Sequence, residues 1–363
     1  MPNALQLKAD YKKYTLDFKF DAGTSRGVLK TKDSYFIKVY RPEYPNVIGT
    51  GEAGPLPKLS MDDLPQIEEV LKDYIEKFSQ QRIQWSEKGI LEFARAFFDD
   101  QHPSIRFAFE TALLDLYNGG QKKILENDFY QNNSPIPING LIWMGDYGFM
   151  ESQIEKKLSD GFSCIKMKIG AIHFEREFEL LEKIRKRFTA DDITLRVDAN
   201  GAFPVEEAMG KLEKLAELDL HSIEQPIKAG QWKEMGHLCQ KSPVPIALDE
   251  ELIGVTTLEK RKQLLDNIHP PYIILKPTLL GGIGDTREWI SLAEERGIGW
   301  WMTSALESNI GLNSIAQLTS SFQTKMPQGL GTGQLYHNNI PSPLKISKGE
   351  IFYDKNTQWG DWQ

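Results

Sequence analysis

Lysine and carboxylate residues recur at regular intervals in the second half of the chain, each at the end of a short β-prone run. The members of this series are Lys168, Asp198, Glu224, Asp249 and Lys276, and they are separated by 30, 26, 25 and 27 positions. Each interval is close to the length of one strand–loop–helix unit. Because the carboxyl ends of the strands meet at one rim of a parallel barrel, we expect these five side chains to converge on one pocket.

Alternation along each run indicates which side chains face the interior of the barrel. In residues 164–168, Ile165 and Met167 share one parity, whereas Cys164, Lys166 and Lys168 share the other. The later runs divide in the same way, so we expect the apolar parity to pack against outer helices and the charged parity to point inward. One charged residue at a strand end could simply begin a solvated loop, but five at matching positions favour a site.

The three carboxylates predict a metal site. Asp198, Glu224 and Asp249 would repel one another in one pocket unless a cation lay among them. Carboxylate oxygens suit a hard cation, so we expect Mg²⁺, with Mn²⁺ as the alternative. No cluster of Cys and His competes as a zinc site, because the six histidines are scattered along the sequence.

The lysines predict proton transfer. Lys168 beside a divalent cation and a second ammonium group would have its charged form disfavoured, which would lower its pKa to roughly 7 to 8 and make it a base at neutral pH. Lys166, two residues earlier on the same face, can supply that second positive charge, and Lys276 comes from the opposite side of the barrel. This arrangement suits removal of a proton next to a carboxylate, with the metal binding the resulting enediolate.

The chain divides into two regions. Residues 1–135 contain two alternating segments (15–20 and 34–40) joined by a Gly-containing turn, and helical periodicity in 61–80 and 104–117, which together predict an α+β domain. The Asn- and Pro-containing segment 131–137 marks the boundary. Residues 136–340 alternate seven β-prone runs with helical stretches, and a weaker eighth run lies near 328–333. The tail, about 341–363, could return as a strand to the first domain.

The composition indicates a globular protein that acts on small molecules. The chain has 363 residues, 40% of them hydrophobic, a net charge of -8 and a pI near 5.5. An acidic balance argues against a nucleic-acid surface, which would favour clustered Lys and Arg. Two cysteines, a charged N-terminal stretch and no long apolar run predict a reduced cytoplasmic location without membrane contact. A homo-oligomer is compatible with all of these features.

Five segments resemble the enolase superfamily, and its muconate-lactonizing subgroup in particular. They are KMK (166–168), RVDANGAF (196–203), IEQP (223–226), ALDEE (247–251) and LKP (275–277). The resemblance implies an α/β fold, a modified TIM barrel of the (β/α)7β type, in which the region 1–135, joined by the tail, is a capping domain. It also implies that Lys168 and Lys276 are the acid/base pair around the three metal ligands, with Asn200 and Glu250 supporting them from outside.

Four further segments resemble the o-succinylbenzoate synthase family within that subgroup: AGTSRGV (22–28), GEAGPLPKLS (51–60), TSALESNIGLNSIAQL (303–318) and GLGTGQLY (329–336). The resemblance implies a metal-dependent syn-dehydration of 2-succinyl-6-hydroxy-2,4-cyclohexadiene-1-carboxylate in menaquinone biosynthesis. The residues expected to contact this carboxylate substrate are Arg26, Ser304, Ser308, Gly331 and Gly333. Turn formation, helix capping or packing would explain the same residues without any role in binding.

Two other functions stay open. An N-acylamino acid racemase or a dipeptide epimerase would use the same metal and lysines, although dipeptide epimerases tend to carry Asp-x-Asp near the eighth strand, where this chain has Gly331 and Gly333. A barrel without catalytic activity that only binds a carboxylate is the more distant alternative.

Overall fold

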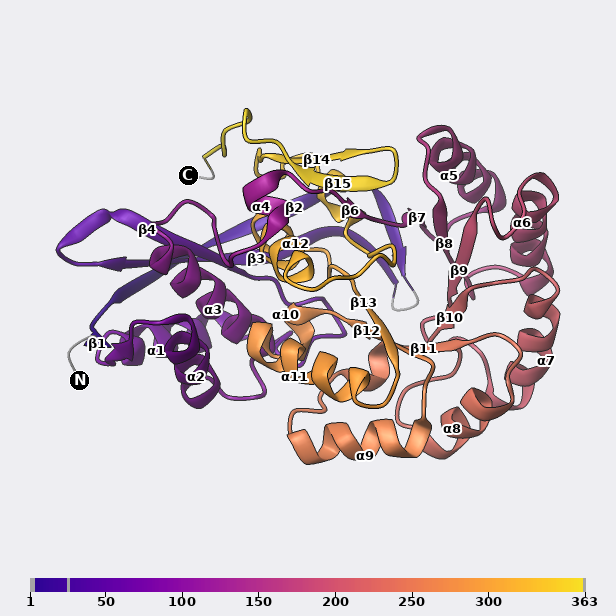
Figure 1. Ribbon diagram of the computed structural model, residues 1–363, viewed down its shortest axis with the longest axis horizontal. Helices are drawn as coiled ribbons and strands as arrows, with labels where there is room; N and C mark the ends of the chain where they lie inside the picture. Colours follow the sequence, from indigo (N-terminus) through magenta and orange to yellow (C-terminus); the bar gives the residue numbers. More distant parts are fainter. Residues whose placement is uncertain (1–3, 25–26, 362–363) are drawn as a thin grey trace.

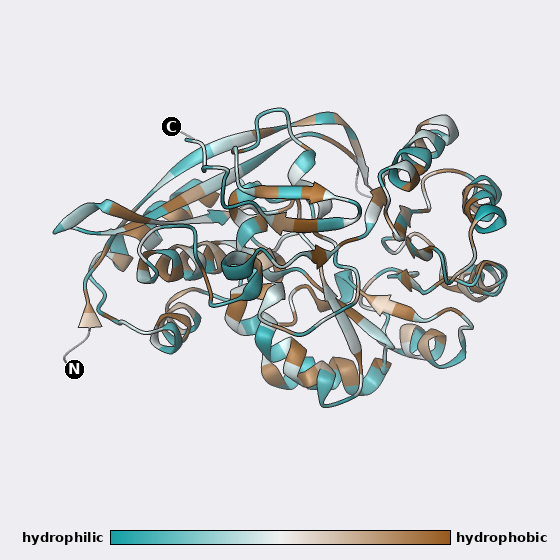
Figure 2. Ribbon diagram, turned by 45° about the horizontal axis from the view of Figure 1, so that its top comes forward, coloured by the Kyte–Doolittle hydropathy of each residue, from teal (hydrophilic) through white to brown (hydrophobic). Residues whose placement is uncertain are grey.

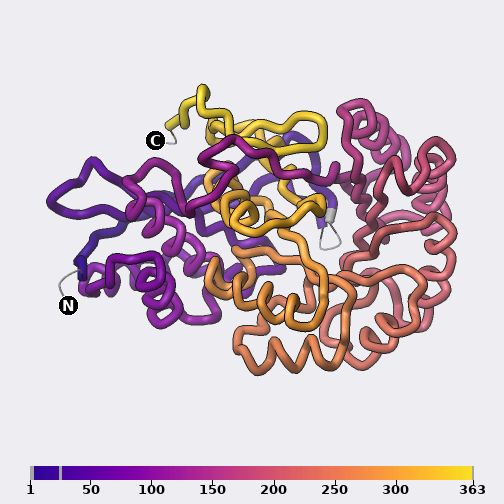
Figure 3. The backbone as a smooth tube through the Cα atoms, in the orientation of Figure 1, coloured from indigo at the N-terminus to yellow at the C-terminus, as the bar shows by residue number. Residues whose placement is uncertain are grey.

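The computed structural model describes residues 4–24 and 27–361. The N-terminal strands and helices lie at one end of an elongated molecule, and strands β7 to β13 curve round at the other end with helices on their outer side (Figures 1 and 3). One short pair, β1 (Ala4–Leu5) with β5 (Ile83–Gln84), lies near the N-terminus. Within the described ranges, no helix combines the length and the apolar character needed to cross a membrane.

The N-terminal region is an antiparallel sheet covered by helices, as its sequence predicts. Strand β2 (Lys8–Thr24) pairs with β3 (Gly27–Arg41), and β3 pairs with β4 (Tyr44–Ala53). Helix α3 (Pro103–Tyr117) lies directly on β4, and a Cβ atom on Gly51 would come within 1.9 Å of the Ala108 carbonyl oxygen. Glycine is therefore required where this helix and strand touch.

Two more helices complete this region. Helix α1 (Ile67–Phe78) buries Ile67, Leu71, Tyr74 and Phe78 on one face, and α2 (Glu87–Phe97) begins at the cap Ser86. The periodicity predicts a helix over 61–80, but α1 begins six residues later. Pro65 explains this difference, because the residue that precedes a proline is disfavoured in a helix.

The second region is the predicted barrel. Its seven parallel strands are hydrogen-bonded in chain order: β7 (Gly140–Ile142), β8 (Cys164–Lys168), β9 (Thr194–Asp198), β10 (Ser222–Glu224), β11 (Ile246–Leu248), β12 (Tyr272–Leu275) and β13 (Gly299–Met302). The predicted eighth strand is reduced to two parallel bridges, from Gln328 to Ile138 and from Gly329 to Thr303. These bridges join the last strand to the first, so the sheet closes into the modified TIM barrel that the sequence predicts.

Helices cover the outside of the barrel. They are α5 (Tyr147–Ser159), α6 (Phe174–Arg187), α7 (Val205–Ala216), α8 (Trp232–Lys241), α9 (Leu258–Ile268), the short α10 (Pro277–Leu280), α11 (Gly282–Glu294) and α12 (Asn309–Ser320). Hydrophobic and hydrophilic residues alternate along these helices (Figure 2). This pattern is typical of helices that bury one face against a sheet and expose the other.

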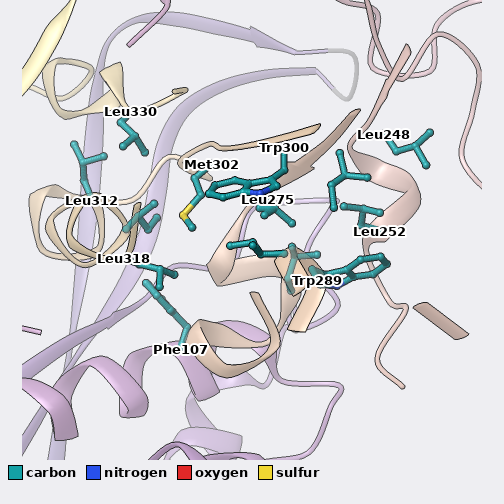
Figure 4. Packing of buried hydrophobic residues seen from close by; sticks show 14 of the residues in the cluster. Phe107, Leu248, Leu252, Leu275, Trp289, Trp300, Met302, Leu312, Leu318 and Leu330 are labelled. Carbon is teal, nitrogen blue, oxygen red and sulfur yellow. The ribbon is translucent and has the colours of Figure 1, made fainter. Parts of the chain in front are cut away.

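Strand parity divides the apolar residues as the sequence predicts. Ile165 and Met167 belong to the main apolar cluster between strands and helices, whereas Ala247, Ile274 and Trp301 form a separate cluster of inward-facing residues. The main cluster also includes Phe107 of α3 together with Trp289, Leu312 and Leu318 of the second region (Figure 4). One continuous core therefore joins both regions, and the limits 1–135 and 136–340 stay a prediction.

The tail forms a hairpin at the predicted boundary. Strand β15 (Glu350–Tyr353) pairs with β14 (Leu344–Ser347) and with β6 (Ile136–Pro137), not with the sheet of β2 to β4. The Tyr353 ring also packs on Tyr130 of helix α4 (Asp128–Asn132), with 4.9 Å between ring centroids. The tail therefore packs against the segment that links the two regions.

Buried charges connect α3 to the start of α11. The Glu110 carboxylate accepts a hydrogen bond of 2.5 Å from the Ile283 backbone N–H, and Arg106 lies 3.1 Å from Asp285. Burial raises the pKa of Glu110 to about 8. Gly282 has a left-handed φ of 95°, and a Cβ atom there would lie 2.2 Å from Glu110 Oε2. The contact between the regions therefore requires glycine at this position.

We predict that Gly282→Ala lowers the melting temperature, because the added methyl group is strained at this φ and collides with Glu110. The expected loss of stability is about 1–3 kcal/mol. Gly210→Ala is the matched control, since Gly210 lies in α7 and an added Cβ there would have no atom within 4 Å apart from the backbone of its own helix. Alanine there should leave stability unchanged or raise it by about 0.5–1 kcal/mol. Equal melting temperatures for the two variants would contradict this account.

Candidate active site

The predicted charged residues meet at the rim of the barrel. Lys166 and Lys168 lie on β8, and Lys276 follows β12 directly. Around the closed barrel, β9, β10 and β11 separate β8 from β12 in one direction, and β7, the eighth segment and β13 separate them in the other. The side chains of β8 and β12 therefore come from opposite walls. All three lysines and Asp198 line one cavity of about 330 Å³.

Each carboxylate at this rim of the barrel pairs with an ammonium group. Lys166 bridges Glu224 and Asp198, with 3.3 Å from its Nζ to Asp198 Oδ2. Lys168 Nζ lies 3.0 Å from the same Asp198 oxygen, and Lys276 Nζ lies 2.5 Å from Asp249 Oδ2. The structure therefore brings together all six residues that the sequence assigns to catalysis and metal binding.

The pKa values of Lys166 and Lys276 reflect their carboxylate neighbours. Burial alone would lower the pKa of Lys166, but the charges of Glu224 and Asp198 outweigh it and hold that pKa above its usual range. Burial and Asp249 act in the same opposing way on Lys276, whose pKa is also raised. The reason is that carboxylates, and not a cation, are the nearest charged neighbours of these ammonium groups.

The carboxylates respond to burial in two different ways. Burial raises the pKa of Glu224 to about 7, with further contributions from Asp198 and Asp249 and only partial compensation by Lys166. Burial would also raise the pKa of Asp198, but Lys168 and Lys166 outweigh it and hold it below its usual range. The pKa of Glu224 is therefore raised in part by the neighbouring carboxylates, as expected for the crowded negative charge that the sequence predicts.

The donor set suits a hard divalent cation, although the carboxylates do not yet converge on one point. Across the described ranges, no three Asp, Glu, His or Cys side chains are arranged to hold a metal ion. Lysine amines lie among Asp198, Glu224 and Asp249 instead. Glu224 Oε1 is nevertheless buried without a hydrogen-bond partner. A buried, unpaired oxygen beside two other carboxylates fits a requirement for further positive charge.

Two amide side chains hold the charged residues in place. Asn200, at a left-handed φ of 45°, accepts a 2.8 Å hydrogen bond from Lys168 Nζ and donates one of 3.0 Å to Glu250. The buried Gln225 accepts from the backbone N–H of Asp249 and donates to the Glu251 carboxylate at 3.0 Å. The family resemblance implies supporting roles for Asn200 and Glu250 but not for Gln225 and Glu251, although these two lie in the IEQP and ALDEE segments.

The two predicted serine contacts have structural roles. Ser304 lines the cavity, but its hydroxyl donates to Glu307 at 2.5 Å and accepts from Thr332 and from the Leu306 N–H, which uses its donor and both lone pairs. Ser308 is the N-cap of α12, is fully buried and donates to Glu52. Neither hydroxyl is left to bind a substrate in this arrangement.

Of the other predicted substrate contacts that the structure describes, only one lines the cavity. Gly331 lines the cavity, whereas Gly333 faces α12, where a Cβ atom would lie 2.7 Å from Asn309 Oδ1. Arg26 lies outside the described residues. Two cavity residues were missed: Asn139 Oδ1 and Thr303 Oγ1 are buried and have no hydrogen-bond partner. Parity could have found both, since each has the inward parity of its run.

Comparison with known proteins agrees with this architecture. Residues 150–356 match the family model described as Enolase C-terminal domain-like. The chain is 47% identical to an o-succinylbenzoate synthase from Desulfotalea psychrophila over 94% of this chain and 98% of that protein. It is 26% identical to an L-Ala-D/L-amino acid epimerase from a Maribacter species, over 86% of this chain and 87% of the relative.

Solved structures give the same result. The crystal structure of MenC from Desulfotalea psychrophila has a TM-score of 0.83 at 42% identity and covers 96% of this chain and 100% of its own. The L-Ala-D/L-Glu epimerase from Bacillus subtilis also reaches 0.83, over 97% of each chain, but at 19% identity it is similar in fold alone. From the matched family model and the extent of the 47% identity, the chain belongs to the enolase superfamily.

Proposed function

We propose that this protein is an o-succinylbenzoate synthase, a hydro-lyase that converts 2-succinyl-6-hydroxy-2,4-cyclohexadiene-1-carboxylate to o-succinylbenzoate and water in menaquinone biosynthesis. The observation that carries the proposal is the placement of Lys168 and Lys276 on opposite walls of one cavity, each paired with a carboxylate, Asp198 or Asp249. A relative with 47% identity over nearly the whole chain bears that name.

Lys168 is the proposed base. Its amine lies in the cavity between Asp198 and Asn200, which fix its position at 3.0 and 2.8 Å. It would take the proton next to the substrate carboxylate and then protonate the departing hydroxide on the same face, which makes the elimination syn. Bound Mg²⁺, or Mn²⁺, held by Asp198, Glu224 and Asp249 would supply positive charge for the substrate carboxylate as its neighbouring carbon loses the proton.

Lys276 has a different role on the opposite face. Its ammonium group, paired with Asp249, would stabilise the anion without transferring a proton. As the ring becomes aromatic, the cation over its face gains a further attraction.

The N-terminal region completes the pocket. Phe20 of β2 and Leu56 from the loop after β4 line the cavity together with Trp143 of the barrel, and the Phe20 and Trp143 rings lie 5.7 Å apart. These side chains would exclude water from the anion that forms during the reaction. This part of the structure supports the capping role that the resemblance implies.

One observation argues against a dipeptide epimerase. In the part of the chain that the structure describes, Asp198 is the only acidic residue that lines the cavity. No second carboxylate is therefore placed to hold the amine of a dipeptide. The substrate of an N-acylamino acid racemase has no free amine, and such an enzyme could use the same two lysines. With an N-acyl amino acid in D₂O, deuterium exchange and racemisation without any dehydration would favour that function.

A cytoplasmic location and a homo-oligomer stay predictions.

We predict that Lys168→Ala lowers kcat for dehydration by about 10²–10⁴-fold, the usual contribution of a positioned acid or base. The measurement is the initial rate of o-succinylbenzoate formation by the full chain with Mg²⁺. Lys186→Ala is the control, since Lys186 pairs with Glu182 on the surface of α6. Unchanged turnover in Lys168→Ala would contradict the assignment of Lys168 as the base, whereas a wild type without any turnover would favour a barrel that only binds its ligand.

We predict that a chelator abolishes turnover and that added Mg²⁺ or Mn²⁺ restores it. Glu224→Gln should raise the Mg²⁺ concentration needed for half-maximal rate by about tenfold or more, because a buried carboxylate ligand loses its charge. Mg²⁺ should also raise the melting temperature of the wild type more than that of the variant, because a ligand of the folded state stabilises it. Full activity in the chelator would contradict the metal assignment.

A further inference from the structure

The cavity extends beyond the reacting lysines. From Lys276 its wall continues through Thr303 and Asn139 to the end of α5 and to Ile346 of the tail hairpin. Within the described ranges, the strand-eight segment meets the start of the first strand here through one bridge, which joins Gln328 to Ile138. We call the part lined by Asn139, Leu141, Lys157, Phe162 and Ile346 the side arm.

Lys157 is the charged residue of the side arm. Its ammonium lies 4.8 Å from the centroid of the Phe162 ring, and its stem crosses Gly140, whose added Cβ would lie 3.1 Å from Lys157 Cδ. Within the described ranges, it has no ion pair and no side-chain hydrogen bond. Burial lowers the pKa of Lys157, and the charge of Asp160 offsets only part of this effect. An anion in the side arm would supply the missing partner.

The other cations of the cavity already have acidic partners. Lys166, Lys168 and Lys276 pair with the carboxylates of the rim. Lys156, the neighbour of Lys157, lies 3.1 Å from Asp160, and its side chain is 71% exposed. Among the cavity residues that the structure describes, Lys157 is therefore the one cation that is not neutralised by the protein.

Two polar side chains lie between Lys276 and the side arm. Thr303 follows Met302, the register partner of Leu275, so Thr303 stands beside Lys276 on the barrel wall. Thr303 bridges Gly329, and Asn139 donates its backbone N–H to Gln328 on the other side of the same segment. Asn139 Oδ1 and Thr303 Oγ1 are buried and unpartnered. Buried polar atoms of this kind are usually satisfied by a ligand or water when the protein works.

These features lead to an inference that rests on the proposed function and extends it. The substrate carries two carboxylates, one next to the reacting carbon and one at the end of its succinyl chain. We propose that the side arm binds the succinyl carboxylate, with the Lys157 ammonium as its counter-ion and with Asn139 and Thr303 as the polar wall along the chain. Lys157 is thus a residue that determines specificity and takes no part in proton transfer.

A structural role for Lys157 makes a different prediction. Lysines in the last turn of a helix favour its negative end, and both Lys156 and Lys157 occupy the last turn of α5. If that were the whole role of Lys157, its replacement would change stability and leave ligand binding alone. Binding of a dicarboxylate and of a monocarboxylate to the same variants separates the two explanations.

The test is calorimetric titration of the full chain, with Mg²⁺ present, using o-succinylbenzoate and benzoate. We expect Lys157→Met to weaken o-succinylbenzoate by about tenfold or more, the effect of losing a charge-assisted contact, and to leave benzoate unchanged. Lys157→Arg should retain most of the affinity. Lys186→Met, on the surface of α6, is the control and should bind both compounds like the wild type. In the dehydration assay, Lys157→Met should raise KM and preserve kcat.

The inference is wrong if folded Lys157→Met binds o-succinylbenzoate as tightly as the wild type, or if it loses affinity for benzoate to the same extent. Melting temperatures of the variants establish that they are folded, and methionine replaces the lysine stem with similar volume. Binding does not depend on turnover. A wild type without dehydration activity would overturn the proposed function, whereas an unaffected Lys157→Met would overturn only the role of the side arm.

Discussion

The arrangement of this protein depends on the mutual neutralisation of buried charges at one rim of the barrel. Three ammonium groups and three carboxylates lie where water is largely excluded, and any one of them would be costly without a partner of opposite charge. Such a cluster tolerates little displacement. The supporting residues are buried for the same reason: Gln225 fixes the segment of Asp249 and Glu251, and Asn200 ties Lys168 to Glu250. A divalent cation among the carboxylates would take over the partnership that Lys166 and Lys276 now provide, which would release lysine from the charges that raise its pKa.

The rest of the fold supplies a rigid frame for this cluster. Inward and outward parity separates the charged lining from the apolar faces that pack on the helices, so the core and the site are built from alternate residues of the same strands. The N-terminal region is held on the barrel by a shared apolar core and by Glu110, whose carboxylate binds the first backbone amides of α11. Because that region contributes Phe20 to the cavity, its attachment also determines how well the pocket is closed.

The sequence predicts the features that depend on spacing and parity, and fails where one polar group can serve several partners. The 25 to 30 residue intervals predict the barrel and the converging charges, because each interval must contain a strand and a helix. Residue type makes Ser304 and Ser308 candidate substrate contacts, but their hydroxyls donate hydrogen bonds to the buried carboxylates of Glu307 and Glu52, and Glu52 lies too far away in the sequence for any local spacing to reveal it. The sequence also cannot show that Glu224 and Asp249 are the charges nearest to Lys166 and Lys276, which raise the pKa values of these two lysines. Pro65, by contrast, carries the signal for the late start of α1.

The centre of the site and its periphery serve different purposes. The lysines and carboxylates of the rim suit any reaction that begins with loss of a proton next to a carboxylate, and relatives named as epimerases and as an o-succinylbenzoate synthase share the fold or the sequence. Since the rim charges balance one another, they discriminate poorly between carboxylate substrates that present the same reacting atoms. Selection must then come from the part of the cavity wall that lies beyond the rim, which runs from Thr303 and Asn139 to Lys157. A cation without an acidic partner in the side arm favours a substrate with a second anionic group. Among the described residues Asp198 is the only acidic one that lines the cavity, which disfavours a substrate with an amine.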